Sequence, residues 1–420
     1  MPTRQTDGPG PTHVRYIVVA LALAVMAVAY LDRVCIAVAA PHIRADLGFS
    51  DTELGYVFSA FTVAYALFEI PGGWLADRFG ARLMLTRIVV WWSAMTMLTG
   101  AANGLASMVA VRFLFGMGEA GLLPTLARAF RRWLPPVEAG RAFGLTVMAG
   151  AVAGALTQPL AAGLVQLVGW RGSFVVFGAV GLVWVGVWLR SFYEEPRLHP
   201  RINAAELAWI GAGDDAGTSH SLAWRALWHR QVAALCAMYF FVIYGWYFFL
   251  TWLPTYLMVE RGFALLQAGW LAALPLVAIA VGVAAGGWAS DWAARQWGES
   301  SGRRVPALLG LPVAAACTAA GFAHPHPWVA TLLLSAAAGC AALSVAPAWA
   351  VCSAIGGRHA GTVTGAMNMF GNLGGALNGV VVGWSRDAFG SWALPLLSMA
   401  AAYGAAAILW TVIRAPAKRA

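Results

Sequence analysis

Long apolar stretches recur from one end of the chain to the other, and they constrain the fold more than any other feature. Each has about 20 residues, enough for a helix to cross about 30 Å of hydrocarbon. Of the 420 residues, 60% are hydrophobic and 11% are charged, whereas a soluble protein carries roughly a quarter charged residues. The sequence therefore predicts an all-α polytopic membrane protein.

The apolar stretches predict twelve transmembrane helices in two halves. No small-residue cleavage site follows the first stretch, so it is interpreted as a retained span and not as a signal peptide. The five cysteines lie within the spans or, for Cys352, two residues beyond one, without metal-ligand spacing, which indicates packing residues and no disulfide framework. The predicted spans are 16–40, 52–76, 83–102, 107–130, 139–166, 172–192, 229–258, 267–290, 304–323, 327–350, 360–383 and 391–413.

The basic residues predict the orientation in a cell inner (plasma) membrane. With both termini cytoplasmic, 21 of the 27 Lys and Arg residues lie inside, four lie outside and two lie within spans. The net charge of +9 is explained by loops that face anionic lipid, so no nucleic-acid partner is expected. The predicted parts are a tail (1–15), a six-helix bundle (16–192), a cytoplasmic linker (193–228), a second bundle (229–413) and a tail (414–420).

Two segments repeat between the halves. Gly73-Trp-Leu-Ala-Asp77 follows the second span, and Gly287-Trp-Ala-Ser-Asp291 follows the eighth, with the same spacing from glycine to aspartate. Two six-helix halves with a site at their interface are typical of transporters that rock between two states. The linker also contains a short amphipathic segment, Asn203–Trp209, which is expected to lie on the membrane surface as a helix.

Several longer strings resemble one family. The segment from Gly73 to Arg82 resembles the cytoplasmic signature loop of the major facilitator superfamily. Other strings resemble its anion:cation symporters, which include bacterial sugar-acid carriers such as the D-galactonate transporters. These strings are Tyr30-Leu-Asp32-Arg33, Gly55-Tyr-Val-Phe-Ser-Ala-Phe61, Phe68-Glu69-Ile-Pro71-Gly-Gly-Trp74, Arg112-Phe-Leu-Phe-Gly116-Met-Gly-Glu119-Ala, Phe248-Phe-Leu-Thr-Trp252-Leu-Pro254-Thr-Tyr256-Leu and Asn368-Met-Phe-Gly371-Asn372-Leu-Gly374-Gly375.

Asp32 and Arg33 are adjacent charges inside the first span. A charge within a membrane span costs several kcal/mol and marks an ion or substrate pathway. The planar guanidinium of Arg33 can hold a carboxylate through two parallel hydrogen bonds, and the resemblance implies that it binds the substrate. A structural ion pair between Arg33 and a carboxylate such as Asp32 is the alternative.

The fourth span carries charges of both signs on one face. Arg112, Gly116 and Glu119 are spaced i, i+4 and i+7. The proton affinity of Glu119 is expected to change with conformation and with anion binding, which is what coupling requires. The resemblance implies that Asp32 and Glu119 carry symported protons and that Arg112 interacts with Asp32. A purely structural network is the alternative, and apart from the proton no cofactor or metal is expected.

Neutral side chains are expected to complete the substrate site. The resemblance implies substrate contacts for Tyr30, Tyr65 and Asn368, and Asn372 follows Asn368 by one helical turn. The centres of the second-half spans carry no ionisable side chain, so that half is expected to recognise neutral groups. Glu69 is assigned to a cytoplasmic-side gate or a packing contact, with proton handling as the alternative. The remaining predicted gate residues are Asp77, Arg78, Arg82 and Asp291.

Departures from the family pattern concern specificity. Where the sugar-acid carriers place a glutamine in the fifth span, this chain has Met148-Ala-Gly150, and where they place polar residues in the tenth it has Val345-Ala-Pro347-Ala-Trp349. A less polar, more aromatic cavity is expected, with Trp246 and Tyr247 near Trp349. An aromatic or less hydroxylated carboxylate is then as plausible a substrate as a sugar acid.

The predicted function is proton-coupled uptake of a small organic carboxylate by a monomeric symporter that alternates access. A neutral-substrate or drug carrier of the same superfamily and a sensor that has lost transport are the alternatives. An enzyme is not expected, because the chain has no HExxH or GxSxG motif and its one GxGxxG, Gly116–Gly121, lies inside an apolar helix.

Overall fold

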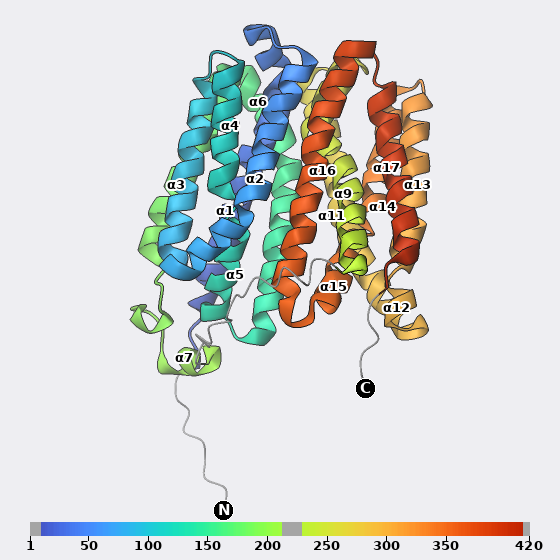
Figure 1. Cartoon of the computed structure of the whole chain (residues 1–420). Coiled ribbons are helices and arrows are strands. Elements are labelled where there is room, and N and C mark those ends of the chain that lie inside the picture. The colour runs from blue at the N-terminus through green and yellow to red at the C-terminus, as the bar shows by residue number, and fades with distance from the viewer. Residues whose placement is uncertain (1–9, 212–228, 415–420) are drawn as a thin grey trace, which may run out of the picture.

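The computed structural model describes residues 10–211 and 229–414, and these residues form a bundle of long, roughly parallel helices (Figure 1). Two ends of the bundle are distinguished. The linker end is where the first half finishes at Ser191 and the second begins at Arg230, and the loop end is where the chain turns between Leu47 and Asp51. Figure 1 shows the linker end at the bottom.

The first half contains six spans. α4 and α5 form one interrupted span, and α6 holds two, because the chain turns at Gly169, whose φ of +71° favours glycine. The helices are α1 (Arg15–Leu47), α2 (Asp51–Phe79), α3 (Ala81–Gly100), α4 (Leu105–Glu119), α5 (Leu122–Trp133) and α6 (Pro136–Ser191).

The second half also contains six spans. α9 with α10 forms one interrupted span, and α14 with α15 forms another. The helices are α9 (Arg230–Thr251), α10 (Leu253–Val259), α11 (Leu265–Trp297), α12 (Glu299–Gly302), α13 (Val305–Ala323), α14 (Pro327–Ala342), α15 (Val345–Gly356), α16 (Ala360–Phe389) and α17 (Ala393–Val412). The predicted all-α fold with twelve spans in two six-helix halves is confirmed. Several helices are longer than predicted, because a helix can continue beyond the hydrocarbon layer.

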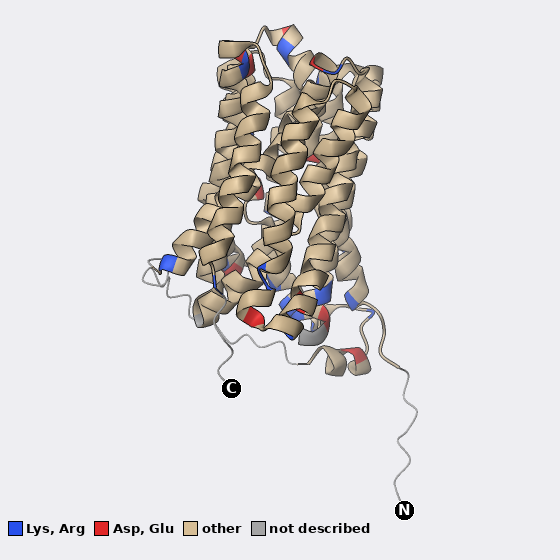
Figure 2. Cartoon of the chain, turned by 90° about the vertical axis from the view of Figure 1, so that its right-hand side faces the viewer, with Lys and Arg blue, Asp and Glu red and all other residues tan. Residues whose placement is uncertain are grey.

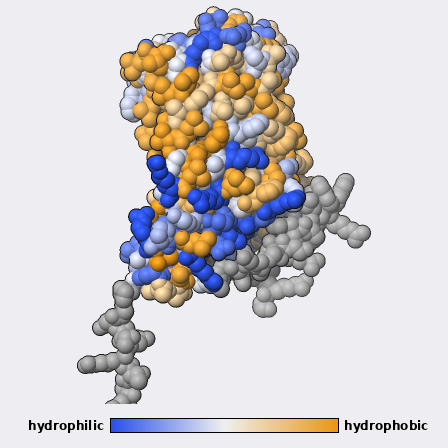
Figure 3. Space-filling view, turned by 90° about the vertical axis from the view of Figure 1, so that its left-hand side faces the viewer, coloured by the Kyte–Doolittle hydropathy of each residue, from blue (hydrophilic) through white to orange (hydrophobic). Residues whose placement is uncertain are grey.

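The surface of the bundle is that of a membrane protein. In the part of the chain that the structure describes, ten helical segments are long and apolar enough to cross a membrane. One of them, α6, holds two spans, and the less apolar α16, which is not among the ten, is the twelfth. Figure 3 shows hydrophobic side chains over most of one wall of the bundle, with hydrophilic side chains gathered toward the linker end and at the opposite tip. Figure 2 shows Lys and Arg gathered mainly at the linker end.

A row of glycines on α16 brings helices of both halves together. A side chain at Gly371 or Gly375 would collide with the rings of Tyr239 and Tyr247 on α9. One at Gly379 or Gly383 would collide with α2. This glycine row lets α16 pack closely against its own half on one side and against the first half on the other.

Carboxylates from distant parts of the chain cap three helix N-termini. Glu206 accepts hydrogen bonds from the backbone N–H groups of Val14 and Arg15 at the start of α1. Glu194 does the same at the start of α3, and Asp387 does so at the start of α2. A carboxylate at a helix N-terminus satisfies free donors and matches the helix dipole. The cap from Asp387 joins the two halves at the loop end.

The linker helix α7 (Ala204–Ile210) corresponds to the amphipathic segment expected on the membrane surface. The helix is present, and Asn203 caps it through the backbone N–H of Glu206 at 2.9 Å. Glu206 itself is fully buried and also accepts a hydrogen bond from the guanidinium of Arg15. Hydrogen bonds with the start of α1 therefore hold this helix in place. Its amphipathic sequence pattern did not predict these contacts.

Candidate functional site

A buried ion pair lies at the centre of the first half. Arg33 of α1 donates through Nη2 to Oε1 of Glu119 at the end of α4. The Glu119 side chain is fully buried, and 18% of the Arg33 side chain is exposed. α4 comes close enough because Gly116 packs against the carbonyl of Phe61 on α2, where a side chain would not fit. The sequence-based alternative paired Arg33 with Asp32, but the structure pairs it with Glu119.

Three aromatic rings surround the Arg33 guanidinium. Its central carbon lies 5.3 Å from the ring centre of Tyr30, 5.0 Å from that of Phe61 and 5.0 Å from that of Tyr65. Such contacts stabilise a cation away from water. Tyr30 and Tyr65 were predicted to contact the substrate, and in this structure their rings contact the Arg33 guanidinium. Phe61 was not singled out, although an aromatic residue one turn before Tyr65 was a usable signal.

Asp32 and Arg112 form a second buried group of charges beside this pair. Both are buried, and they interact electrostatically without an ion pair within 4 Å among the described residues. The side chain of Asp32 interacts with that of Thr96, while Nε and Nη1 of Arg112 have no hydrogen-bond partner among the described residues. The guanidinium of Arg112 lies 4.4 Å from the ring centre of Phe115. Unpaired polar atoms in such a place are costly and point to a role in which their partners change.

A small cavity separates the charged cluster from the second half. Its volume is about 20 Å³, and its lining comes from α1, α2, α4 and α9. It is lined by Arg33, Ile36, Phe58, Phe61, Thr62, Arg112, Tyr247, Leu250 and Thr251. A cavity of this size holds about one water molecule. An organic anion therefore fits beside Arg33 only if the surrounding helices move apart.

Neutral polar side chains of the second half form a chain of hydrogen bonds that begins at this cavity. The hydroxyl of Tyr247 donates to Oδ1 of Asn372 at 3.0 Å, and Nδ2 of Asn372 donates to the carbonyl oxygen of Asn368 at 3.0 Å. Nδ2 of Asn368 then donates to both carboxylate oxygens of Glu69 on α2, each at 2.8 Å. The structure thus brings together the two predicted asparagines and adds Glu69 to their group.

The departures from the family pattern have a structural explanation. A side chain at Gly150 or Gly154 on α6 would collide with the ring of Tyr30, so these glycines make room for one wall of the aromatic group around Arg33. On the other side, Nε1 of Trp349 donates to the hydroxyl of Tyr239 at 3.0 Å. Of the aromatic residues expected around the cavity, Tyr247 lines it, and Trp246 and Trp349 are not among its lining residues.

The predicted gate residues lie at the linker end. Asp77 lies 3.7 Å from Arg128 and from Arg131, both on α5. Arg82 donates to the carbonyl oxygen of Leu189 at 2.7 Å. All of these contacts are within the first half.

The remaining gate residues follow the same pattern. Asp291 pairs with Arg303 at 3.1 Å within the second half, and the guanidinium of Arg78 lies over the rings of Trp74 and Phe79. Glu194, which caps α3, also lies 3.4 Å from Arg132 and 3.7 Å from Arg128. Sequence reasoning missed it, and its only signal was an acidic residue directly after the sixth span.

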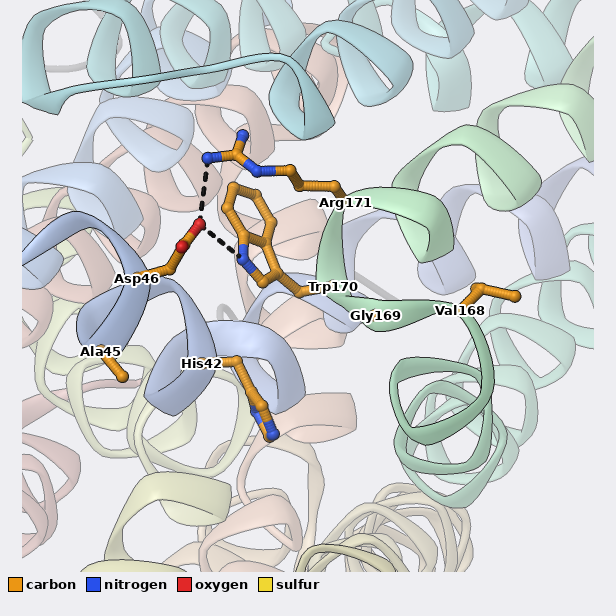
Figure 4. Close-up of a pocket in the computed structure, with 7 residues that line it drawn as sticks. All are labelled: His42, Ala45, Asp46, Val168, Gly169, Trp170 and Arg171. Carbon is orange, nitrogen blue, oxygen red and sulfur yellow. Dashed lines mark hydrogen bonds and ion pairs between the residues drawn. The ribbon is translucent and has the colours of Figure 1, made fainter.

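A wider pocket of about 600 Å³ opens at the loop end (Figure 4). Asp46 accepts hydrogen bonds from Nη2 of Arg171 at 3.0 Å and from Nε1 of Trp170 at 3.2 Å. Nη1 of Arg171 donates to the carbonyl oxygens of Gly100 and Ala102. The one arginine of this pocket is thus engaged in joining helices, so the pocket is a weaker candidate for anion binding than the Arg33 cluster.

Comparison with known proteins agrees with the geometry. Residues 22–379 match the model of the Major Facilitator Superfamily. A "Probable sulfoacetate transporter" of Cupriavidus necator is 36% identical over 94% of this chain and 92% of its own length. The D-galactonate transporter of Escherichia coli is 32% identical over 94% of this chain and 95% of its own.

The structure is also similar to solved transporters. A bacterial homologue of the human lysosomal transporter Spinster, in an inward-facing and occupied conformation, matches with a TM-score of 0.77. The match covers 96% of this chain and 97% of that one at 20% sequence identity. At this identity the likeness concerns the fold alone.

Proposed function

The chain belongs to the Major Facilitator Superfamily, and we propose that it is a proton-coupled symporter that takes up a small organic anion by alternating access. The anionic group of the substrate is a carboxylate or a sulfonate. The bilayer is the inner membrane, with both termini cytoplasmic. The named relatives, a sulfoacetate transporter and a D-galactonate transporter, support an anionic substrate.

The observation that carries this proposal is the buried pair of Arg33 and Glu119 at the cavity wall. Three aromatic rings lie around the Arg33 guanidinium, so this positive charge is largely shielded from water and can bind an anion. The guanidinium fork matches the oxygens of a carboxylate or sulfonate. In this structure Glu119 holds one nitrogen of that fork, Nη2, while Nε has no hydrogen-bond partner among the described residues. We propose that a substrate anion binds the fork and displaces Glu119.

The replacement of Glu119 by the substrate anion at Arg33 couples substrate binding to proton uptake. When the substrate anion binds Arg33, Glu119 loses its ion-pair partner while it remains buried. An unpaired buried carboxylate costs several kcal/mol, and taking up a proton removes that cost. Asp32, which is buried beside Arg112 without an ion pair within 4 Å among the described residues, is the candidate for a second proton.

Alternating access follows from the closed cavity. The two halves are joined at the loop end, where Asp387 of α16 caps α2 and Arg386 lies 3.6 Å from Asp51. The cavity beside Arg33 has about 20 Å³, too little for an organic anion. We propose that the halves rock about this site and open it to one end at a time.

Reconstituted protein tests the proposal. Proteoliposomes receive an imposed pH gradient and radiolabelled sulfoacetate, D-galactonate, D-glucarate or an aromatic carboxylate, and uptake is measured with and without a protonophore. At least one anion should accumulate against its gradient, and the protonophore should abolish the accumulation. Uptake of neutral solutes alone would contradict the proposal, and so would accumulation that the protonophore does not affect.

A further inference from the structure

Among residues 10–211 and 229–414, Glu69 differs from the other carboxylates near the centre of the bundle, Asp32 and Glu119. It accepts hydrogen bonds, but it has no cation within 4 Å. Its partner is the neutral amide of Asn368, which lies in the other half of the molecule. The single Nδ2 group lies 2.8 Å from each carboxylate oxygen. The amide therefore already holds a carboxyl group, which belongs to the protein itself.

The position of this contact links it to the movement of the halves. Asp387 and Ser59 supply the hydrogen bonds between α2 and α16 nearer the loop end, the latter to the carbonyl oxygen of Ala376 at 2.6 Å. The hydrogen bonds from Asn368 to Glu69 lie farther along α2 toward the linker end than the one made by Ser59. This bridge joins α2 to α16 on the linker side of the contacts made by Asp387 and Ser59.

The position also links the bridge to the substrate site. Tyr65, one helical turn before Glu69, has its ring 5.0 Å from the Arg33 guanidinium. Asn372, one turn after Asn368, accepts from Tyr247 in the cavity wall. Glu69 and Asn368 thus continue the same two helix faces that line the site, one turn farther toward the linker end.

We propose that Glu69 is a resident counter-ligand, which holds the amide of Asn368 while the site is empty and is displaced by the polar group of an arriving anion. This inference rests on the proposed function, because it assumes an anionic substrate that reaches Asn368. Displacement breaks a hydrogen bond that joins α2 to α16 on the linker side of the site. Glu69 thereby sets the substrate affinity and couples binding to the separation of the halves at that end.

The movement is tested first, without any substrate. Nitroxide labels at Phe79→Cys on α2 and Trp297→Cys on α11, both half-exposed residues at the linker end, report the distance between the halves in a background without the five native cysteines. Glu69→Leu and Asn368→Ala should each lengthen or broaden the distance distribution, and the double variant should add nothing. Unchanged distributions in both single variants, or additive effects in the double variant, would overturn the inference.

The affinity is tested with whichever anion of the panel the parent protein transports. Glu69→Leu should bind it more tightly, by about fivefold to thirtyfold, because no resident carboxylate has to be displaced. The milder Glu69→Gln should shift affinity in the same direction. Removing a negative charge could by itself favour an anion, so each variant is repeated with Asn368→Ala, where the gain should disappear.

A gain that persists without Asn368 would show general electrostatics and overturn the inference. If the parent transports none of the anions, the proposed function fails, and the distance measurement still decides whether the bridge exists.

Discussion

The two halves share a helical plan and differ in their buried charges. Among the described residues, every buried Asp, Glu or Arg precedes Gly211, and the members are Arg15, Asp32, Asp51, Arg112, Glu119 and Glu206. The second half buries neutral polar groups instead, such as Asn372, Asn378 and Ser344. We infer a division of labour in which the first half binds charge and protons and the second supplies neutral contacts and sliding surfaces.

We infer from this difference that the first half carries the coupling between substrate and protons. Buried charges change their interactions strongly when a partner or a proton moves, whereas amides and hydroxyls change little. The second half instead carries the glycine row on α16, which lets that helix pack closely against both halves. Each prediction below tests one side of this contrast.

The largest effect is expected at Arg33. Arg33→Lys keeps the charge but removes the planar fork, so binding of the transported anion should fall by about 30- to 100-fold. The measurement is equilibrium binding in detergent. The matched control is Arg190→Lys, the same change at an exposed position, which should bind like the parent. Parent-like affinity in Arg33→Lys would place charge recognition elsewhere.

A second effect concerns coupling at Glu119. Glu119→Gln imitates permanent protonation, so the variant should exchange substrate across the membrane and lose uphill accumulation driven by a pH gradient. Counterflow and gradient-driven uptake are measured on the same proteoliposomes. Asn372→Asp is the contrast, because it places a carboxylate in the neutral half, and it should impair binding without making Glu119→Gln competent again. If Glu119→Gln still concentrates substrate, its role is structural and Asp32 becomes the next candidate.

The sequence allowed the spans and the central charges to be predicted for simple physical reasons. Stretches of about 20 apolar residues leave few alternatives to transmembrane helices. Charges inside them, such as Asp32, Arg112 and Glu119, stand out because burial is expensive. The neutral pair Asn368 and Asn372 followed from helical spacing and from the family resemblance.

The pairing of these groups could not be predicted, because it depends on how each helix is rotated and how closely it packs. Asp32 is adjacent to Arg33 in sequence, yet Glu119 is the residue that reaches it, since Gly116 lets α4 approach α2. The bridge from Glu69 to Asn368 and the cap of Glu194 on α3 join residues that are far apart along the chain. No local pattern marks such partners.

The predicted gate residues Asp77, in the first half, and Asp291, in the second, allow the two halves to be compared at the linker end. Asp77→Asn should favour the form open at that end by about 0.5–1 kcal/mol, because the carboxylate no longer holds Arg128 and Arg131 of α5. A cysteine introduced into the linker-end vestibule should then be labelled about two- to fivefold faster. Asp291→Asn should have less effect, because 61% of that side chain is exposed. Equal labelling in Asp77→Asn and the parent, with normal turnover, would remove the gate assignment.

The smallest effect is expected at the linker, where Glu206 of α7 fastens that helix to the first half. Burial alone raises the pKa of Glu206, but hydrogen bonds from Thr12, from the backbone of Arg15 and Val14, and from the Arg15 guanidinium outweigh it and hold the pKa below the usual value. A lowered pKa in the folded state contributes stability above the usual glutamate pKa of about 4.3, and this contribution is lost as the pH falls through the lowered value. Glu206→Gln should therefore lower the free energy of unfolding at pH 7 by about 1 kcal/mol, and the difference from the parent should shrink below about pH 4. Glu195→Gln, at an exposed position in the same linker, should match the parent at every pH. A stability difference for Glu206→Gln that stays constant from pH 7 to pH 3 would show that shape, and not the charge on the α1 cap, fastens the linker to the charged half.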